Sequence, residues 1–225
     1  MLPDSNPFSE GDYGAKTRYQ DIGIAERYDA ERFLSLLGRW ADYLEKKALL
    51  KCLGNLTPAD FILDIPLGTG RIAGFLISRG FQVAGADISE EMMAVAKRRL
   101  EVFPNFRGAF RQNAEQLTFP DGFFDAIVSV RFMGHLPPPI RVRILKEMKR
   151  VTRKQVIIAY YISGFMTDIS KYLQGIGRKT GHQLYPAKIE EVKKEIFEAG
   201  LEIISDLPML RFVSECHFLV LKPKS

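Results

Sequence analysis

Hydrophobic and polar positions follow two different periods along this chain, and the changes of period divide it into short strands and longer helices. Short apolar runs bounded by turn residues predict buried strands, and apolar residues recurring every three or four positions predict helices. The two kinds of element alternate from about residue 56 onward, which is typical of parallel βαβ units. The predicted strands are 61–65, 82–86, 105–112, 124–130, 155–162, 201–205 and 211–221, and the predicted helices between them are 70–79, 89–103, 140–151 and 187–199.

The end of the chain departs from this alternation. Only the short stretch DLPML lies between the strands predicted at 201–205 and 211–221, so we expect these two strands to pair antiparallel. The sequence therefore predicts an α/β fold with a seven-stranded, mostly parallel sheet. We expect the last strand to be antiparallel and helices to cover both faces.

Two regions lie outside the repeating pattern. Residues 1–55 predict an N-terminal arm and a helical cap, because a Pro- and Gly-rich start precedes apolar residues at helical spacing. These apolar residues are Phe33, Leu36, Leu37, Trp40, Tyr43, Leu44, Leu49 and Leu50. Residues 56–225 predict the main domain, with a glycine-rich, basic insert at about 163–186.

Composition narrows the class of protein only a little. The chain has 225 residues, of which 46% are hydrophobic and 26% charged, as in globular proteins. Its two cysteines, Cys52 and Cys216, are far apart and predict reduced core thiols rather than a metal site. The start of the chain lacks the apolar segment of a secretory signal, and the longest apolar run, Val156–Ile162, is too short to cross a bilayer. These features predict a cytoplasmic protein with no transmembrane segment.

The stretch LDIPLGTGR at 63–71 carries the first chemical signal. Gly68 and Gly70 follow a strand and open a helix, where glycine lets backbone N–H groups approach a ligand closely. Asp87 ends the next strand and can accept hydrogen bonds from both ribose hydroxyls of an adenosine. The glycine spacing is one residue too long for a dinucleotide fingerprint. Asp64 would repel a pyrophosphate but suits a cofactor with an ammonium and a sulfonium group.

Three stretches occur in a specific order: FILDIPLGTGR, VAGADIS and QNAEQLTFPDGFFDAIVS. Over roughly residues 28–222 the chain resembles the class I S-adenosylmethionine-dependent methyltransferases. The resemblance implies a Rossmann-like fold, S-adenosyl-L-methionine as cofactor and S-adenosyl-L-homocysteine as its product. The cofactor-binding residues that follow are Asp64, Pro66, Gly68, Thr69, Gly70, Arg71, Asp87, Ile88, Asn113, Ala114, Val130, Arg131 and Tyr28.

The resemblance also implies a role for each part of this set. The glycine loop holds the methionine part of the cofactor, and Asp87 binds the ribose. Ile88 packs on the adenine, while Asn113 and Ala114 contact the adenine edge. Pro66 fixes its own φ and removes one N–H donor, and we interpret the loop as a variant that still binds the cofactor. We expect Tyr28 and Arg32 to cover the cofactor cleft from the N-terminal side.

The segment SVRFMGHLPPP after the fourth predicted strand indicates where the methyl acceptor would lie. His135 is the candidate general base, because a histidine titrates near neutral pH. The alternative is that His135 caps the following helix or packs the loop. Arg131 and Phe132 either line the cofactor or contact an acidic acceptor. We expect a structural role for His217 and leave substrate contact open for His182.

The residues between Arg141 and Lys154 are strongly basic, with Glu147 as the one acid. A helix with Val142, Leu145 and Met148 inward would turn most of these cations toward solvent. A solvated helix face is the favoured interpretation, and a footprint for nucleic acid or anionic lipid is the alternative.

We therefore expect methyl transfer to a small-molecule or lipid-linked acceptor, most simply at oxygen. Two alternatives stay open: an RNA methyltransferase that uses the basic face, and a cofactor-binding accessory protein without turnover. The sequence lacks the motifs of enzymes that methylate DNA bases, and none of its motifs indicates an oligomeric state or a metal.

Overall fold

The computed structural model describes most of the chain. The described residues are 23, 25, 27, 29, 33–162, 185, 187–209 and 216–224. Tyr28, Arg32 and His182 lie outside them, as do nearly all of the predicted insert at 163–186 and the predicted arm.

The sheet is the one that the sequence predicts. Its strands are β1 (Phe61–Asp64), β2 (Gln82–Asp87), β3 (Phe106–Arg111), β4 (Phe124–Ser129), β5 (Thr152–Tyr161), β6 (Leu201–Pro208) and β7 (Cys216–Pro223). They lie in the order β3-β2-β1-β4-β5-β7-β6. Strands β1 to β5 pair in parallel, while β7 is antiparallel to both β5 and β6. The predicted fold class, including the antiparallel last strand, is confirmed.

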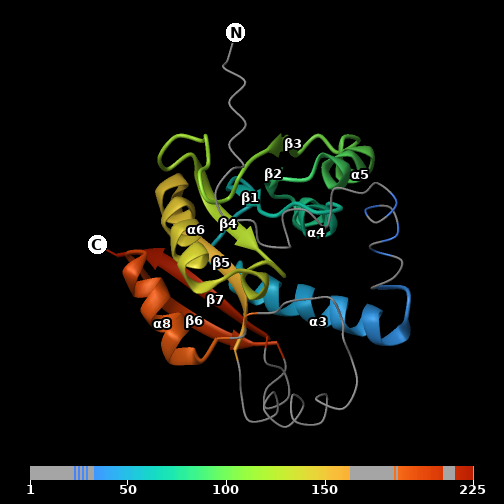
Figure 1. The fold of residues 1–225 in the computed structure, drawn as a ribbon. Coiled ribbons are helices and arrows are strands. Elements are labelled where there is room, and N and C mark those ends of the chain that lie inside the picture. Colours follow the sequence, from blue (N-terminus) through green and yellow to red (C-terminus); the bar gives the residue numbers. More distant parts are fainter. Residues whose placement is uncertain are drawn as a thin grey trace.

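Helices cover both faces of the sheet. The helices are α3 (Leu36–Cys52), α4 (Arg71–Ser78), α5 (Glu90–Leu100), the 3-10 helix η1 (Met133–His135), α6 (Pro138–Val151) and α8 (Ile189–Glu198). In Figure 1, α6 and α8 lie together on one side of the sheet, and α4 and α5 lie on the other. Helix α3 packs on the same face as α4 and contacts β6 and β7.

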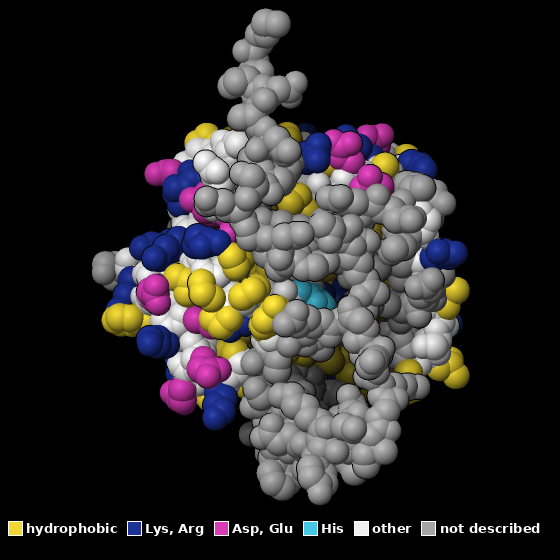
Figure 2. Space-filling model, viewed as in Figure 1, with side chains coloured by type: hydrophobic (Ala, Val, Ile, Leu, Met, Phe, Trp, Pro, Cys, Tyr) yellow, Lys and Arg dark blue, Asp and Glu magenta, His cyan; other side chains and the backbone are white. Residues whose placement is uncertain are grey.

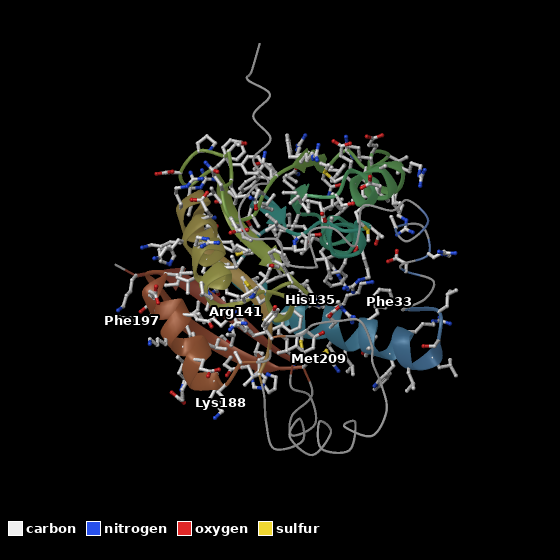
Figure 3. All side chains as sticks on the ribbon, viewed as in Figure 1. Phe33, His135, Arg141, Lys188, Phe197 and Met209 are labelled. Atoms are coloured by element: carbon white, nitrogen blue, oxygen red, sulfur yellow. The ribbon has the colours of Figure 1, made fainter. Side chains whose placement is uncertain are left out.

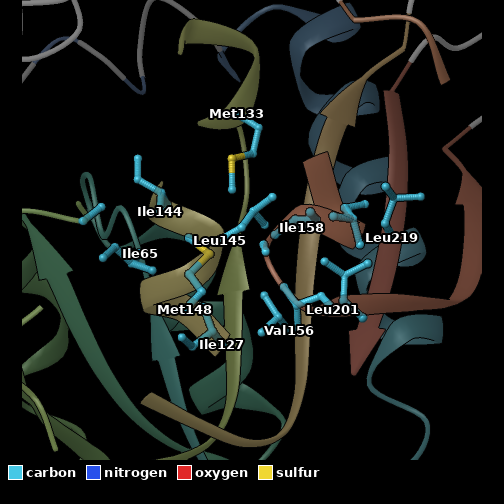
Figure 4. Packing of buried hydrophobic residues seen from close by; sticks show 14 of the residues in the cluster. Ile65, Ile127, Met133, Ile144, Leu145, Met148, Val156, Ile158, Leu201 and Leu219 are labelled. Carbon is cyan, nitrogen blue, oxygen red and sulfur yellow. The ribbon is translucent and has the colours of Figure 1, made fainter. Parts of the chain in front are cut away.

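Alternating side chains of each strand build two cores. Leu63 of β1 belongs to the cluster beneath α6 and α8, whereas its neighbour Ile62 belongs to the cluster beneath α3, α4 and α5. Figure 4 shows the first cluster, in which Leu145 and Met148 of α6 pack against Val156 of β5. Because both faces are buried, the central strands are apolar at most positions, which made them recognisable in the sequence.

Several strands begin or end at residues other than the predicted ones. Strand β5 begins at Thr152, three residues before the predicted start, directly after α6 ends at Val151. Asp206, Leu207 and Pro208, which were expected to form a connection, belong to β6 and pair with β7. Pro208 closes an edge strand, the position in a sheet where a missing N–H costs least.

The apolar pattern of α3 predicts the helix correctly, but five of its eight residues are exposed. Leu44, Ala48, Leu49 and Cys52 are buried. In contrast, Leu36 and Leu37 are 84% and 82% exposed, and Trp40 and Tyr43 are 58% and 53% exposed. The most buried polar residue of α3 is Glu45, which the apolar pattern did not indicate.

The solvated basic face expected between Arg141 and Lys154 holds for most of its cations, since Arg143, Lys146, Arg153 and Lys154 are exposed, but not for Arg141. Arg141 is only 1% exposed, and its guanidinium donates to both carboxylate oxygens of Glu195 in α8, at 2.6 and 2.9 Å. It also donates to the backbone carbonyls of Leu136 and Tyr185. The hydroxyl of Tyr160 donates to Glu195 as well, at 2.8 Å. Arg141 is therefore a structural cross-link and contributes nothing to a surface footprint.

Two further expectations can be compared with the described residues. Cys52 and Cys216 are buried and form no disulfide, as predicted. His217 lies in β7 and pairs with Asp206 at 2.7 Å, which agrees with a structural role. None of the helices in the described part of the chain combines the length and apolar character that a bilayer crossing requires.

Candidate active site

A cleft lies at the carboxyl ends of β1, β2 and β4, where open α/β sheets bind ligands. Its lining is Pro66, Leu67, Gly68, Thr69, Arg71, Ile72, Asp87, Ile88, Met92, Val130, Arg131, Phe132 and His135. Residues from three separate predicted segments therefore meet in one cavity.

The glycine loop has the backbone that only glycine adopts easily. Gly68 and Gly70 have φ angles of 53° and 80°. A Cβ on Gly70 would lie 2.7 Å from a side-chain carbon of Leu100, so Gly70 serves the packing of α4 on α5. A Cβ on Gly68 would meet no atom within 4 Å. Gly68 thus leaves room for a ligand to approach the loop backbone. The peptide bond between Ile65 and Pro66, at the start of the loop, is cis.

Asp87 joins the loop to the second strand. Its Oδ2 accepts the Gly68 N–H at 2.7 Å, and its Oδ1 accepts the Ser89 N–H at 3.0 Å. Burial raises the pKa of Asp87, and the hydrogen bonds from Ser89, Gly68 and Ile88 partly offset this. An ionised carboxylate on the wall of a cleft can accept the hydroxyls of a ribose, as the sequence predicted.

Asp64 lies beneath the loop and is completely buried. Within the described part of the chain, neither of its carboxylate oxygens accepts a hydrogen bond of normal geometry. Burial raises the pKa of Asp64 well above its usual range, and the charge of Asp87 raises it further, against the opposing effects of the Ala73 N–H and Arg71. Two neighbouring buried carboxylates without a cation are costly. Their arrangement suits a positively charged ligand such as an ammonium or sulfonium.

A buried carboxylate on α3 holds two arginines at the mouth of the cleft. Glu45 accepts from Arg71 at 2.5 Å and from Arg131 at 2.8 Å. The two guanidiniums lie 4.7 and 5.1 Å from the centre of the Phe33 ring. This cluster connects the helical cap, the glycine loop and the exit of β4. The sequence signal was weak, because Glu45 stands among lysines on a helix that also carries exposed apolar residues.

Arg131 adopts a backbone conformation that arginine rarely takes. Its φ is 58°, in the left-handed region, and it is the first residue of the sharp turn after Val130. Such a conformation costs roughly 1–3 kcal/mol and persists where surrounding contacts enforce it. The ion pair with Glu45 is one such contact. The turn directs the following residues, including Phe132, along the cleft wall.

Two residues of the N-terminal segment, Ala25 and Asp29, contact α5 and the glycine loop. The Thr69 hydroxyl donates to Asp29 at 2.8 Å, and Asp29 also pairs with Arg99 of α5. Ala25 is fully buried against Met92 and Val95 of α5. These contacts agree with a cap that covers the cofactor side of the cleft, although Tyr28 itself lies outside the described residues.

His135 lines the cleft from the segment that follows β4. It ends η1, and Figure 3 places it at the centre of the viewed face, where a histidine side chain reaches the surface in Figure 2. The following helix α6 has Pro137 as its N-cap and no side-chain capping bond, so His135 is not its cap. Arg141 fixes the adjacent Leu136 carbonyl from below. The histidine is thus held at the cleft by a rigid loop.

The structure brings nine of the fourteen predicted site residues to the cleft wall. These are Pro66, Gly68, Thr69, Arg71, Asp87, Ile88, Val130, Arg131 and His135. Asp64 and Gly70 support the loop from below, whereas Asn113 and Ala114 are not part of the lining. The Asn113 side-chain oxygen, expected at the adenine, accepts the Glu115 N–H at 3.1 Å. Leu67, Ile72 and Met92 were missed because apolar wall positions carry no motif.

The chain is similar to several known methyltransferases. A family model described as a methyltransferase domain matches residues 62–155, which span β1 to the start of β5. A demethylmenaquinone methyltransferase of Beutenbergia cavernae is 30% identical over 165 residues, which cover 66% of this chain and 65% of that protein. A phosphatidylethanolamine N-methyltransferase of Cereibacter sphaeroides is 28% identical over 155 residues, covering 66% and 73%. The chain spans 48% to 65% of the length of several demethylmenaquinone methyltransferases.

The fold recurs in solved structures. A crystal structure of the magnesium protoporphyrin IX methyltransferase of Synechocystis PCC 6803 with bound S-adenosylhomocysteine matches with a TM-score of 0.73 and 18% identity. The match covers 93% of this chain and 98% of that one. The sheet order and the cleft at its carboxyl edge thus define a Rossmann-like methyltransferase fold. Residues 62–155 match a methyltransferase domain, and the relatives and solved structures that resemble the chain are methyltransferases, which supports the predicted resemblance to the class I S-adenosylmethionine-dependent methyltransferases.

Proposed function

We propose that the protein transfers the methyl group of S-adenosylmethionine to a hydroxyl of a small-molecule or lipid-linked acceptor. The observation that carries this proposal is the presence of Asp87, Gly68 and His135 on the walls of one cleft. The relatives' names give two acceptor classes, a demethylmenaquinone and a phosphatidylethanolamine, and the second name specifies methylation at nitrogen. The acceptor atom, oxygen, is inferred from the position of His135 alone.

The residues of the cofactor side fit the group that the family implies. Asp87 would accept the ribose hydroxyls, and Ile88 would pack on the adenine. The glycine loop would hold the methionine part, with the Asp64 carboxylate beneath it opposite the positive charge. When bound, S-adenosylmethionine supplies a methyl group already activated by the sulfonium.

The residues of the acceptor side would then align and deprotonate the acceptor. Phe132 would supply an apolar wall that excludes water from the reacting atoms. A ring nitrogen of His135 would accept the proton of the acceptor hydroxyl, while bound S-adenosylmethionine would supply the methyl group to the oxygen and leave as S-adenosylhomocysteine. The protonated His135 would then return its proton to water. Alignment of the two substrates supplies much of the rate.

The alternative of an RNA acceptor has lost support from the charge pattern. Arg143 pairs with Glu115, and Arg150 pairs with both Glu147 and Asp121. Arg141 is buried. Carboxylates therefore neutralise much of the surface that a polyanion would need on α6.

A labelled-methyl assay tests the proposal directly. The protein is incubated with methyl-labelled S-adenosylmethionine and a panel of quinols, phenols, ethanolamine phospholipids and RNA, and the products are identified by mass spectrometry. Label on an oxygen of a quinol, phenol or lipid is the expected result. Label on nitrogen or carbon would exclude the role given to oxygen. Tight cofactor binding without any product would favour an accessory protein.

A further inference from the structure

Helix α3 carries an apolar stripe that the described structure leaves exposed. Leu36, Trp40, Tyr43 and Leu50 recur at spacings that place them on one face of the helix, with Leu37 beside them. In Figure 1 the N-terminal turns of α3 extend away from the sheet. Single exposed apolar residues are common, but a continuous stripe on one helix marks a binding surface.

The charges of α3 are sorted between its two faces. Arg39, Lys47 and Lys51 are exposed alongside the stripe. The two acidic residues of the helix, Asp42 and Glu45, turn the other way and both pair with Arg71 at 2.5 Å. The outer face therefore combines apolar side chains with positive charge only.

A groove between α3 and the end of β6 extends this surface. It is lined by Leu44, Lys47, Ala48, Lys51, Asp206, Leu207, Pro208 and Met209. Figure 3 shows Met209 on this side of the molecule, below the cleft that holds His135. Asp206, the carboxylate in the lining, is paired with His217 at 2.7 Å. Two lysines thus stand over an apolar floor, an arrangement that fits a phosphate attached to acyl chains.

We propose that the outer face of α3 docks on a bilayer surface that contains anionic lipids. The apolar stripe would lie at the boundary between headgroups and acyl chains, where tryptophan and tyrosine are favoured. Arg39, Lys47 and Lys51 would contact lipid phosphates, with their apolar stems against the chains. A second copy of this chain is a poorer occupant, because facing stripes would bring the two Lys47 ammonium groups together. The proposal does not depend on which molecule accepts the methyl group.

The only tryptophan of the chain makes the test direct, because Trp40 stands in the middle of the stripe. The full-length protein is mixed with vesicles of phosphatidylcholine alone, or with about 30 mol% phosphatidylglycerol added. We expect Trp40 emission to shift to the blue and to be quenched by brominated acyl chains, on the anionic vesicles only. Roughly 0.5 M NaCl should weaken the binding, because it screens the lysines.

Paired variants separate the two contributions. The double variant Leu36→Asp, Leu37→Asp keeps the reporter and should abolish the blue shift. The double variant Lys47→Gln, Lys51→Gln should weaken vesicle partition about 30-fold, since each basic residue near such a surface contributes about fivefold. The matched controls are Val102→Asp, at an apolar residue 77% exposed elsewhere, and Lys146→Gln with Lys194→Gln on α6 and α8. These controls should bind vesicles like the wild type.

Thermal melting by circular dichroism confirms that each variant is folded, and S-adenosylhomocysteine titration reports the cleft independently. A wild-type protein that ignores anionic vesicles overturns the docking proposal, even if it binds the cofactor. Equal loss of vesicle binding in the control variants also overturns it. A dimer in sedimentation that Leu36→Asp, Leu37→Asp converts to a monomer, with no Trp40 response to vesicles, would assign the stripe to self-association instead.

Discussion

The carboxylate of Asp87 accepts the backbone N–H of Gly68 at 2.7 Å. Together with the bond from the Leu67 N–H to the Ala86 carbonyl at 2.8 Å, this hydrogen bond ties the end of β2 to the glycine loop that follows β1. Asp87 is thus both a wall of the site and a support of its loop. Two carboxylate oxygens have several acceptor positions, so Asp87 can keep these bonds while accepting others from a ligand.

Replacement of Asp87 should weaken cofactor binding. We expect Asp87→Ala to reduce the affinity for S-adenosylhomocysteine by about 1.5–3 kcal/mol, because charge-assisted hydrogen bonds are lost. Asp87→Asn should lose less, since its amide oxygen can still accept the Gly68 N–H. Isothermal calorimetry measures both. Asp121→Ala, at an exposed residue outside the cleft, is the control, and the ribose assignment fails if Asp87→Ala binds as the wild type does.

A binding test with NAD checks whether the glycine loop is built for S-adenosylmethionine rather than for a dinucleotide. The carboxylate of Asp64 beneath the loop and the long glycine spacing both disfavour a pyrophosphate. We expect calorimetry to show binding of S-adenosylmethionine and S-adenosylhomocysteine and no binding of NAD. Tight binding of NAD with no heat from S-adenosylhomocysteine would contradict the reading of this loop.

Asp64 should make the unliganded protein less stable as pH rises. Its folded-state pKa lies well above the ordinary value of 3.8, because burial disfavours the charged form. The stability that protonated Asp64 contributes is therefore fully present below 3.8 and is lost as pH rises through the raised pKa. Asp64→Asn cannot ionise, so its melting temperature should fall less than that of the wild type between about pH 5 and pH 8.

The substitution Asp64→Asn should also weaken binding of the cofactor. A positively charged ligand offsets the cost of ionising Asp64, and Asp64→Asn removes that attraction, by roughly 1–3 kcal/mol. Calorimetry and thermal melts on one protein sample give both quantities. A variant that is more stable at pH 8 and binds more weakly supports the role given to Asp64. Unchanged affinity would confine Asp64 to a structural role.

Glu45 should matter more for stability than its place on a surface helix indicates. Glu45→Gln leaves Arg71 and Arg131, which are 14% and 20% exposed, without their shared carboxylate. We expect a loss of about 2–3 kcal/mol in urea unfolding, less than for a fully buried pair because water reaches both guanidiniums. Glu90→Gln breaks the exposed pair with Arg111 and should cost under about 0.5 kcal/mol. Similar losses of unfolding free energy for the two variants would show that the pairs of Glu45 stabilise the protein no more than an exposed surface pair does.

The sequence predicted the parts of the fold that repeat a local pattern. Parallel strands such as β4 are buried at every position and mostly apolar, and Ser89 caps α5 as expected, with its hydroxyl accepting the Met92 N–H. The order of Gly68, Asp87 and His135 along alternating strands and helices was enough to place all three at one edge of the sheet. In a parallel sheet the segments that follow successive strands lie at the same edge, so residues far apart in the sequence come close together.

The missed features depend on contacts between distant segments. Arg141 looked like one more surface cation, and only the position of α8 brings Glu195 within 2.6 Å of it. The outward stripe of α3 looked like a core face, because periodicity shows that a helix has an apolar side without showing what covers it. The bond between Asn113 and the Glu115 N–H likewise depends on a turn that no motif announces.

His135 carries the strongest claim about chemistry. If the acceptor is a hydroxyl, its proton must leave as the methyl group arrives, and His135 is the histidine on the wall of the cleft. We expect His135→Ala to lower turnover by about 10²–10⁴-fold and to leave the affinity for S-adenosylhomocysteine nearly unchanged. The wild-type rate should fall at low pH as the imidazole takes up a proton, and the variant should lose this acidic limb.

His217→Ala is the matched control for this experiment. It removes a histidine paired with Asp206 in β7, outside the cleft lining, so its turnover and its pH profile should follow the wild type. A loss below tenfold for His135→Ala, with the acidic limb intact, would mean that the imidazole is not the base. The reaction would then depend on alignment, or on an acceptor that is already ionised when it enters the cleft. The second case is recognised by a rate that follows the pKa of the acceptor when substituted phenols of increasing acidity are compared.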